Sequence, residues 1–275
     1  GDVYKRQIYN QLTSQFYRIT TDSRFPYQVY ATQQDNSSIT VPSATESGAI
    51  SWNHCYPVGT GESGDIAVHP EDPDIAYIGA IGSSPGGNGV LQRYDHRTKQ
   101  VRLVNVWPEQ QTGVAQRDLQ YRFAWTFPIV FSPHDSNTLY AGGSHLFRTR
   151  NEGQSWDALS PDLTRADDCK LGVSGGLTVD SSGAETYGTI STFVESSIQK
   201  GSFWAGSDDG LVHLSTDGGG NWENVTPSVL PEWCYVYCID ASRHDPEVYY
   251  LSATSYKLDD YRPLLIKSED GGRSW

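Results

Sequence analysis

Short apolar runs alternate with polar turns along the whole chain. The runs are four to seven residues long, rich in Val, Ile, Thr, Tyr and Phe, and bounded by Gly, Pro, Asp or Ser. None shows a sustained apolar period of 3.6 residues, so the pattern predicts β-strands. One kind of strand recurs five times and carries an aromatic residue, usually after a turn rich in Pro or Asp. These aromatics are Tyr30, Tyr77, Tyr140, Trp204 and Tyr250.

The spacing of these aromatics predicts a repeated unit. They lie 46 to 64 residues apart, which is the length of a four-stranded propeller blade with variable loops. One further strand precedes each aromatic strand and two follow it, with Ala49–Asn53 as the fourth strand of the first unit. The predicted fold is all-β, a β-propeller of four-stranded antiparallel blades. Five blades are predicted, the last incomplete, at roughly residues 8–55, 56–110, 120–162, 186–228 and 233–275.

The first seven residues differ from the rest of the chain. Residues 2–7, DVYKRQ, resemble a translated transposase adaptor from a sequencing library, so residues 1–7 are left out of the fold prediction. The chain contains no Met, and its last residue, Trp275, falls within a repeated motif. We therefore expect a fragment of a longer protein, truncated at both ends and derived from environmental DNA.

Three segments fit the pattern Ser/Thr-x-Asp-x-Gly-x-Ser/Thr-Trp, each between the third and fourth predicted strand of a blade. They are Thr149–Trp156, Ser215–Trp222 and Ser268–Trp275. In such a turn the Asp or Asn accepts hydrogen bonds from backbone amides, and Gly supplies a left-handed residue. The Trp is expected to pack between blades. The residues with these structural roles are Asn151, Gly153, Trp156, Asp217, Gly219, Trp222, Asp270, Gly272 and Trp275.

This pattern resembles the Asp-box, or BNR repeat, in a propeller of the glycosyl hydrolase-like or sortilin-like group. The group is related to xyloglucan-degrading endoglucanases, and the resemblance covers roughly residues 12–275. It implies a ring of seven to ten blades, of which five are present here. It also implies an exported protein, extracellular or periplasmic, that takes a polysaccharide or peptide ligand. In the family the Asp-boxes are structural turns on the face away from the ligand.

The charge of the chain narrows the choice of partner. It carries 33 acidic and 20 basic side chains, a net charge of −13 at pH 7. This acidity argues against nucleic acid, because a phosphate backbone needs a cationic surface. No run of 18 apolar residues is present, so we expect no membrane contact within the chain. The four cysteines and the acidic loops lack the spacing of known metal sites, and we expect neither a metal nor a cofactor.

Antiparallel strands place the loop between the second and third strands on the same face as the segment leading into the first. On this face carboxylates lie beside aromatic residues, as in sugar sites, where rings stack on pyranoses and carboxylates do acid/base chemistry. The predicted catalytic residues are Glu62, Asp208 and Asp209. The predicted ligand-binding residues are Asp35, Asn36, Arg122, Trp125, Tyr256, Lys257, Asp259 and Asp260.

Several alternatives stay open at this stage. Adjacent Asp208 and Asp209 either raise one another's pKa, which would suit a general acid, or close a tight turn with Gly210. In the related endoglucanases a catalytic Asp follows the aromatic strand of the first blade. In this chain Ile81 occupies the matching position. If the blades are aligned one blade earlier, the matching loop contains Asp35. Three classes of function remain: a glycosidase with two carboxylates flanking one bond, a peptide receptor without turnover, and an assembly scaffold.

Overall fold

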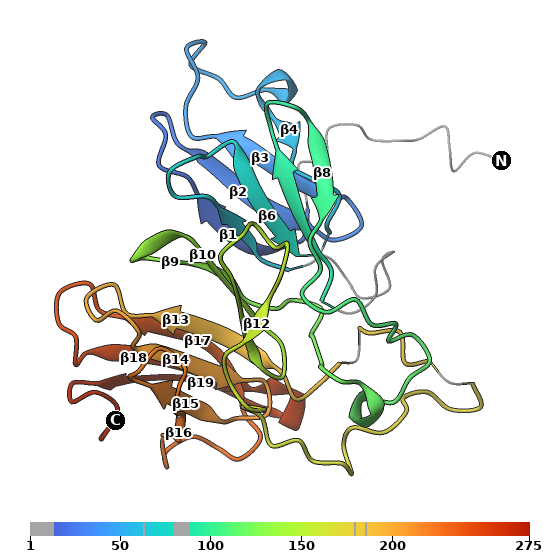
Figure 1. Ribbon diagram of the computed structural model, residues 1–275, viewed down its shortest axis with the longest axis vertical. Helices are drawn as coiled ribbons and strands as arrows, with labels where there is room; N and C mark the ends of the chain where they lie inside the picture. Colours follow the sequence, from blue (N-terminus) through green and yellow to red (C-terminus); the bar gives the residue numbers. More distant parts are fainter. Residues whose placement is uncertain (1–13, 63, 80–88, 179, 185) are drawn as a thin grey trace.

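The computed structural model describes residues 14–62, 64–79, 89–178, 180–184 and 186–275. Within these ranges the regular structure consists of β-strands and short 3-10 helices, and the strands form five antiparallel sheets. The sheets follow one another along the chain as the blades of a β-propeller (Figure 1). The predicted all-β fold with five blades is confirmed. A larger ring of seven to ten blades stays a prediction.

The first three sheets have four strands each, paired in chain order. The first sheet contains β1 (Phe16–Thr21), β2 (Gln28–Gln33), β3 (Ser38–Pro42) and β4 (Tyr56–Pro57). The second contains β5 (Ile66–Val68), β6 (Ile75–Gly79), β7 (Leu91–Asp95) and β8 (Gln100–Leu103). The third contains β9 (Ile129–Ser132), β10 (Asp135–Gly142), β11 (Leu146–Thr149) and β12 (Asp157–Ala158).

The last two sheets repeat this arrangement. The fourth contains β13 (Ile190–Glu195), β14 (Phe203–Ser207), β15 (Val212–Ser215) and β16 (Glu223–Asn224), and the fifth contains β17 (Tyr235–Ala241), β18 (Tyr249–Ser255) and β19 (Asp260–Ser268). The described 3-10 helices are η2 (Trp52–His54), η3 (Gln116–Asp118) and η4 (Tyr256–Leu258). None of the helices in the described part of the chain is long and apolar enough to cross a membrane.

One detail of the strand prediction is wrong. The predicted fourth strand Ala49–Asn53 runs into η2, because Ser51 and His54 form a local hydrogen-bonded turn, with the Ser51 amide 3.0 Å from His54 Nδ1. The strand itself forms later, at β4. In the fifth sheet Tyr250 has the same register as Trp204 in the fourth, since Phe203 and Tyr249 each pair with the first Ser of the following turn. Trp204 is buried, whereas Tyr250 is 41% exposed.

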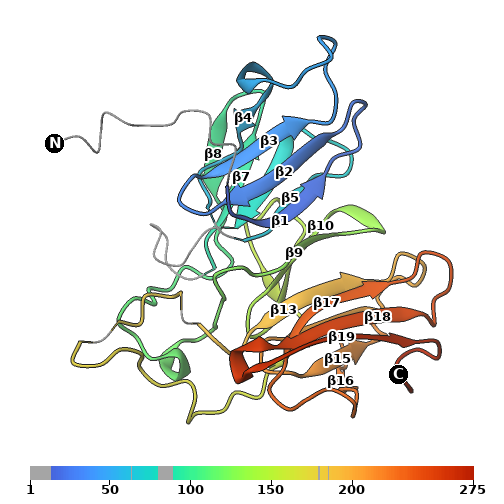
Figure 2. The same cartoon turned by 180° about the vertical axis from the view of Figure 1, so that it is seen from behind.

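The first strands of the sheets meet at the centre of the molecule. Residues of β1, β5, β9, β13 and β17 line a central cavity of about 460 Å³. Arg18 of β1 reaches across it, since its Nη2 donates to the carbonyl oxygen of Tyr237, in β17, at 3.4 Å. The same guanidinium lies 4.6 Å from the centre of the Tyr237 ring. Arg18 therefore joins the first sheet to the last across the cavity. Figure 2 shows from behind that β9 lies between β1 and β13.

The three Trp-containing segments form one repeated turn. In the second, Asp217 Oδ1 accepts hydrogen bonds from the Asn221 amide and the Ser215 hydroxyl, both at 2.9 Å, and Gly219 has a φ of 95°. The first and third turns repeat these contacts. Each Trp packs on the preceding sheet: Trp156 Nε1 donates to the Val104 carbonyl at 3.1 Å. The turns therefore join neighbouring sheets, as the sequence predicts.

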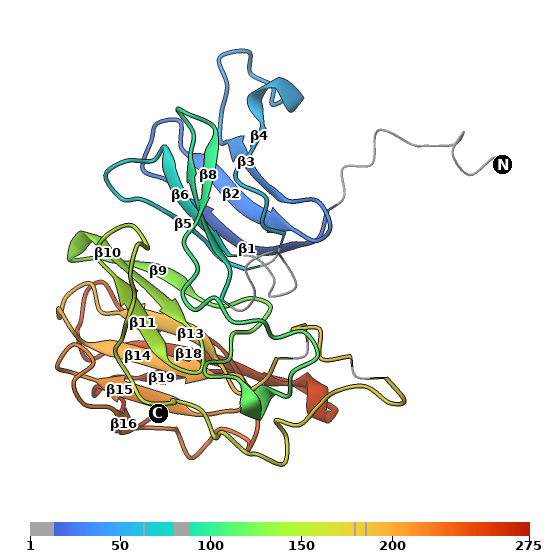
Figure 3. The same ribbon diagram turned by 45° about the vertical axis from the view of Figure 1, so that its right-hand side comes forward.

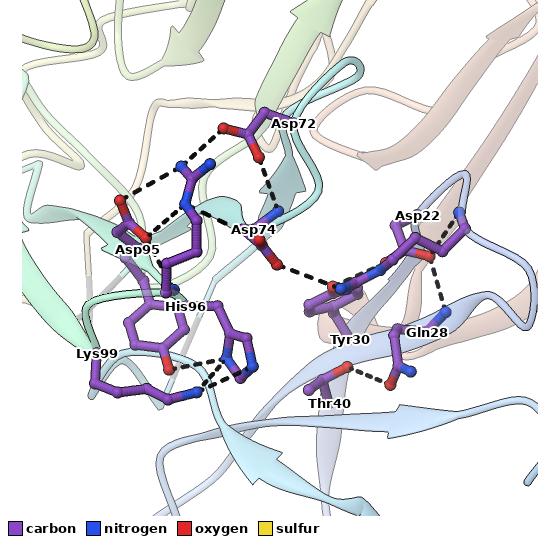
Figure 4. Close-up of polar contacts among 12 residues, drawn as sticks. Asp22, Gln28, Tyr30, Thr40, Asp72, Asp74, Asp95, His96 and Lys99 are labelled. Atoms are coloured by element: carbon purple, nitrogen blue, oxygen red, sulfur yellow. Dashed lines mark hydrogen bonds and ion pairs between the residues drawn. The ribbon is translucent and has the colours of Figure 1, made fainter.

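A charged network joins the first two sheets. Arg24 contacts Asp22 at 2.5 Å, the Tyr30 hydroxyl, and Asp74 of the second sheet at 3.5 Å (Figure 4). In the second sheet Arg97 contacts Asp72 at 2.9 Å. Hydrogen bonds from Arg24, Tyr30 and the Gln28 amide lower the pKa of Asp22 against the effect of its burial. The network keeps Asp22 ionised and fixes the two sheets to each other.

Candidate functional site

A pocket of about 510 Å³ lies against the fourth and fifth sheets. Its walls come from the segment leading into β13, the β14–β15 hairpin, the segment leading into β17, and η4. In Figure 3, η4 and the long segment leading into β13 lie at the same end of the molecule. The aromatic and carboxylic side chains of the pocket are Tyr187, Asp208, Trp233, Tyr235 and Tyr256, and its cations are Lys170 and Lys257.

Asp208 lies at the tip of the hairpin between β14 and β15. Its carboxylate accepts hydrogen bonds from the amide and the hydroxyl of Thr189, both at 2.9 Å, and its own amide donates to the Thr189 carbonyl at 3.0 Å. Burial raises the pKa of Asp208 to about 7, helped by the charge of Asp209 and opposed by the bonds from Thr189. A raised pKa of this size favours the protonated form near neutral pH, and a protonated carboxyl group is a hydrogen-bond donor.

Asp209 has a different environment. Its Oδ1 accepts from the Ser207 hydroxyl at 2.6 Å and its Oδ2 from the Arg165 amide at 2.8 Å, while its carbonyl accepts from Arg165 Nε at 2.8 Å. Burial raises the pKa of Asp209 against these bonds. The hairpin closes at Gly210, whose φ is 90°. The pKa of both carboxyl groups is thus raised, chiefly by burial, with the charge of Asp209 contributing at Asp208, and the pair also lies in a tight turn with Gly210. Catalysis by the pair stays a prediction.

Arg122 supports the pocket from within the protein. Its side chain is buried, and its Nε donates to the Gly188 carbonyl at 3.0 Å while Nη2 pairs with Asp162 at 2.6 Å. Gly188 directly precedes Thr189, the residue that holds Asp208. Arg122 thus fixes the segment that orients the pocket carboxyl group. The sequence predicts ligand contact for Arg122, and the structure shows its guanidinium engaged in bonds within the protein.

Cations lie over the aromatic rings of the pocket. Lys170 Nζ lies 4.5 Å from the centre of the Trp233 ring, and Arg165 Cζ lies 4.4 Å from it. Lys257 Nζ lies 5.9 Å from the ring centres of both Tyr235 and Tyr256. Cations at these distances are attracted by the π-electrons of the rings. The rings therefore hold the ammonium groups at the rim of the pocket.

The other predicted residues do not line this pocket. Glu62 is half-buried before β5, Trp125 is half-buried before β9, and Asp35 and Asn36 are exposed in the β2–β3 turn. Asp259 and Asp260 follow η4 directly. Asp260 pairs with Arg262 at 2.6 Å, and these hydrogen bonds lower its pKa to about 2. Ile81 lies outside the described residues. In those ranges no three His, Cys, Asp or Glu side chains are grouped to hold a metal.

Three predicted residues, Asp208, Tyr256 and Lys257, meet in the pocket, and several others were missed. Tyr187, Trp233 and Lys170 were not predicted. They belong to the long segments leading into the first strands of the fourth and fifth sheets. Strand order places these segments on the predicted binding face, but no pattern in their sequence marks which of their side chains reach the pocket.

Comparison with known proteins shows the fold. No family model and no curated protein matches the sequence. Among solved structures, the chain is similar to the GH74 xyloglucanase from Xanthomonas campestris, with 17% identity and a TM-score of 0.56 over 87% of this chain and 34% of that one. It is also similar to Sqt1 from Chaetomium thermophilum, with 13% identity and a TM-score of 0.53 over 88% of this chain and 55% of that one. The chain thus spans about a third of the length of the first protein and about half of the length of the second. It is a β-propeller that resembles a GH74 xyloglucanase in fold.

Proposed function

We propose that this chain is part of an exported Asp-box β-propeller of the glycosyl hydrolase-like and sortilin-like group, and that it binds a glycan. The ligand lies on the face made by the loops between the second and third strands and the segments leading into the first strands. The observation that carries the proposal is the pocket in which a buried carboxyl group, Asp208, lies with three tyrosines, Tyr187, Tyr235 and Tyr256. The fold similarity to a xyloglucanase supports a glycan as ligand.

The chemistry of the pocket fits a saccharide. Pyranose rings present apolar C–H faces that pack on aromatic rings, and hydroxyl groups that need hydrogen-bond partners. Tyr256 is half-exposed at the rim and offers an accessible ring. Asp208 provides a hydrogen-bond donor while it is protonated, because burial raises its pKa to about 7. A sugar can therefore stack at the rim and direct a hydroxyl group toward the carboxyl group.

Hydrolysis of a β-glycosidic bond is a second candidate function, favoured by the raised pKa of Asp208. A general acid in a glycosidase needs such a pKa, and a second carboxylate about 5 to 9.5 Å away. The oxygens of Asp209 are bonded to Ser207 and Arg165, so Asp209 is the weaker choice for that partner. Among the described residues lining the pocket, Asp208 is the single acid. Binding without hydrolysis is therefore the function that we prefer.

Calorimetric titration with oligosaccharides of β-glucans, including xyloglucan, tests the proposal. The wild type is compared with Asp208→Ala and Tyr256→Ala, and with Glu223→Ala on the exposed fourth strand β16 as a matched control. We expect both pocket variants to lose at least tenfold in affinity and the control to bind like the wild type. The proposal is wrong if the pocket variants bind as tightly as the control. Release of reducing ends, lost in Asp208→Asn, would establish the glycosidase instead.

A further inference from the structure

The rim of the pocket is cationic although the protein is strongly acidic. Net charge is −13, yet the charged side chains at the opening are Lys170 and Lys257. Both are exposed, and neither pairs with a carboxylate in the part of the chain that the structure describes. Lys99 and Lys200 also lack a carboxylate partner among the described ion pairs, so what distinguishes Lys170 and Lys257 is that both lie at the opening of one pocket. Two ammonium groups at one opening favour a ligand that carries negative charge.

Aromatic rings hold both ammonium groups in place. Trp233 lies under Lys170, and Tyr235 and Tyr256 lie beside Lys257. Such contacts direct a cation without neutralising it, so the charge stays available to an incoming anion. Arg165 differs, because its guanidinium donates to the Asp209 carbonyl and pairs with Glu232 at 3.5 Å. The cations open to a ligand are therefore the two lysines.

The acids near the pocket do little to oppose an anionic ligand. Asp208 lines it, and burial raises its pKa to about 7, which lowers its negative charge at pH 6. Asp209 is bonded to Ser207 and Arg165. Of the acids adjoining the lysines in sequence, Asp260 pairs with Arg262, while Asp168 and Asp259 are exposed to water, which screens their charge. At the pocket itself the positive charges of Lys170 and Lys257 dominate.

We propose that the pocket recognises an acidic saccharide, with Lys170 and Lys257 binding the carboxylate of a uronic acid residue. This inference rests on the proposed glycan-binding function and narrows its ligand. The tyrosines receive the face of the sugar ring, the carboxyl group of Asp208 bonds a sugar hydroxyl, and the lysines bind the sugar carboxylate. Neutral glycans of the same length lack the last of these contacts.

Calorimetric titration at pH 6 and low salt compares uronic acid oligosaccharides with neutral oligosaccharides of equal length. The proteins are the wild type, Lys170→Gln, Lys257→Gln, and Lys200→Gln on the exposed β13–β14 turn as a matched control. We expect the acidic ligand to bind about tenfold more tightly than the neutral one. Each pocket variant should lose about fivefold in affinity for the acidic ligand alone, the effect of one exposed ion pair. Added salt should weaken acidic binding and leave neutral binding unchanged.

The outcomes separate this inference from the function on which it rests. Equal binding of acidic and neutral oligosaccharides, unchanged in the lysine variants, overturns the inference and leaves glycan binding in place. Preference for a sulfated over a carboxylated oligosaccharide of the same backbone overturns the assignment to a uronic acid. Binding of neither oligosaccharide, with binding of a short peptide through its terminal carboxylate, overturns both proposals. Loss of the acidic preference in the two pocket variants, but not in Lys200→Gln, supports the inference.

Discussion

Replacing Asp208 by Asn tests whether burial of this carboxyl group controls how stability depends on pH. Burial raises the pKa of Asp208 from its ordinary value of 3.8 to about 7. At about 1.4 kcal/mol for each pKa unit, ionisation of this group costs the folded protein up to roughly 4 kcal/mol. Asn stays neutral at every pH and keeps an oxygen that accepts the hydrogen bond from the Thr189 amide.

The sign and the pH range of the effect follow from the two pKa values. Below about pH 4, Asp208 is protonated in both the folded and the unfolded chain, so the variant and the wild type differ little. Between pH 4 and pH 7 the unfolded chain releases the proton first, and the wild type loses stability relative to the variant. Above pH 7 the difference is constant. Asp208→Asn should then be more stable by a few kcal/mol, less about 1 kcal/mol for an altered hydrogen bond.

The assay is urea unfolding followed by tryptophan fluorescence, at pH values from 4 to 8. Subtracting the wild-type curve from that of the variant removes the contribution of every other titrating group. Asp217→Asn serves as the opposite control, because hydrogen bonds from Asn221 and Ser215 lower the pKa of Asp217 to about 2. That variant should be less stable above pH 4 and should approach the wild type as the pH falls toward 2. A difference for Asp208→Asn that does not change with pH would refute the reasoning.

Three further predictions concern the supports of the fold. Gly153→Ala should destabilise the protein by about 1 to 3 kcal/mol, because Gly153 has a φ of 76° and a Cβ would lie 2.6 Å from Val104. Gly48→Ala is the control: Gly48 has a φ of 71°, but no atom lies within 4 Å of the added Cβ, so we expect a loss of about 1 kcal/mol in the same unfolding assay. Arg122→Met should destabilise by about 1 to 3 kcal/mol and weaken glycan binding, because it removes the ion pair with half-buried Asp162 and leaves the Gly188 carbonyl without its side-chain donor; an unchanged melting temperature would contradict this. Trp156→Phe keeps an aromatic ring but removes the bond to the Val104 carbonyl, so we expect a loss of about 1 kcal/mol, and no loss would show that packing alone joins the sheets.

Much of the fold was predictable because each blade repeats the same local signals. The strand pattern placed the central strands of all five sheets, and the spacing of Ser/Thr, Asp/Asn, Gly and Trp gave the three turns. The errors arose where the local signal was ambiguous. The apolar residues of Ala49–Asn53 fit a strand, but hydrogen bonds between Ser51 and His54 form a turn there. The fourth strands are as short as two residues, too few for alternation to locate them.

The candidate pocket was predictable only in part. Asp208, Tyr256 and Lys257 lie in loops between second and third strands, whose position follows from strand order. Tyr187 and Trp233 come from connections without any periodic pattern, so their approach to Asp208 depends on tertiary packing. The role of Arg122 could not be read from the sequence, because an Arg in a loop is equally suited to bind a ligand or to pair with a carboxylate of the protein.

Each turn tryptophan reaches backward along the sequence. Trp156 bonds Val104, Trp222 bonds Leu159, and Trp275 packs against Trp204 with ring centres 6.0 Å apart. During synthesis, a sheet therefore docks onto its predecessor only when its own turn leaves the ribosome, and the partner is by then already made. We expect a nascent chain to become protease-resistant in steps, one for each tryptophan, so that ribosome-bound chains halted before and after Trp156 should differ in cleavage of the second sheet. Because each turn tryptophan packs on the preceding sheet, we expect the sheets to assemble in order from the N-terminus.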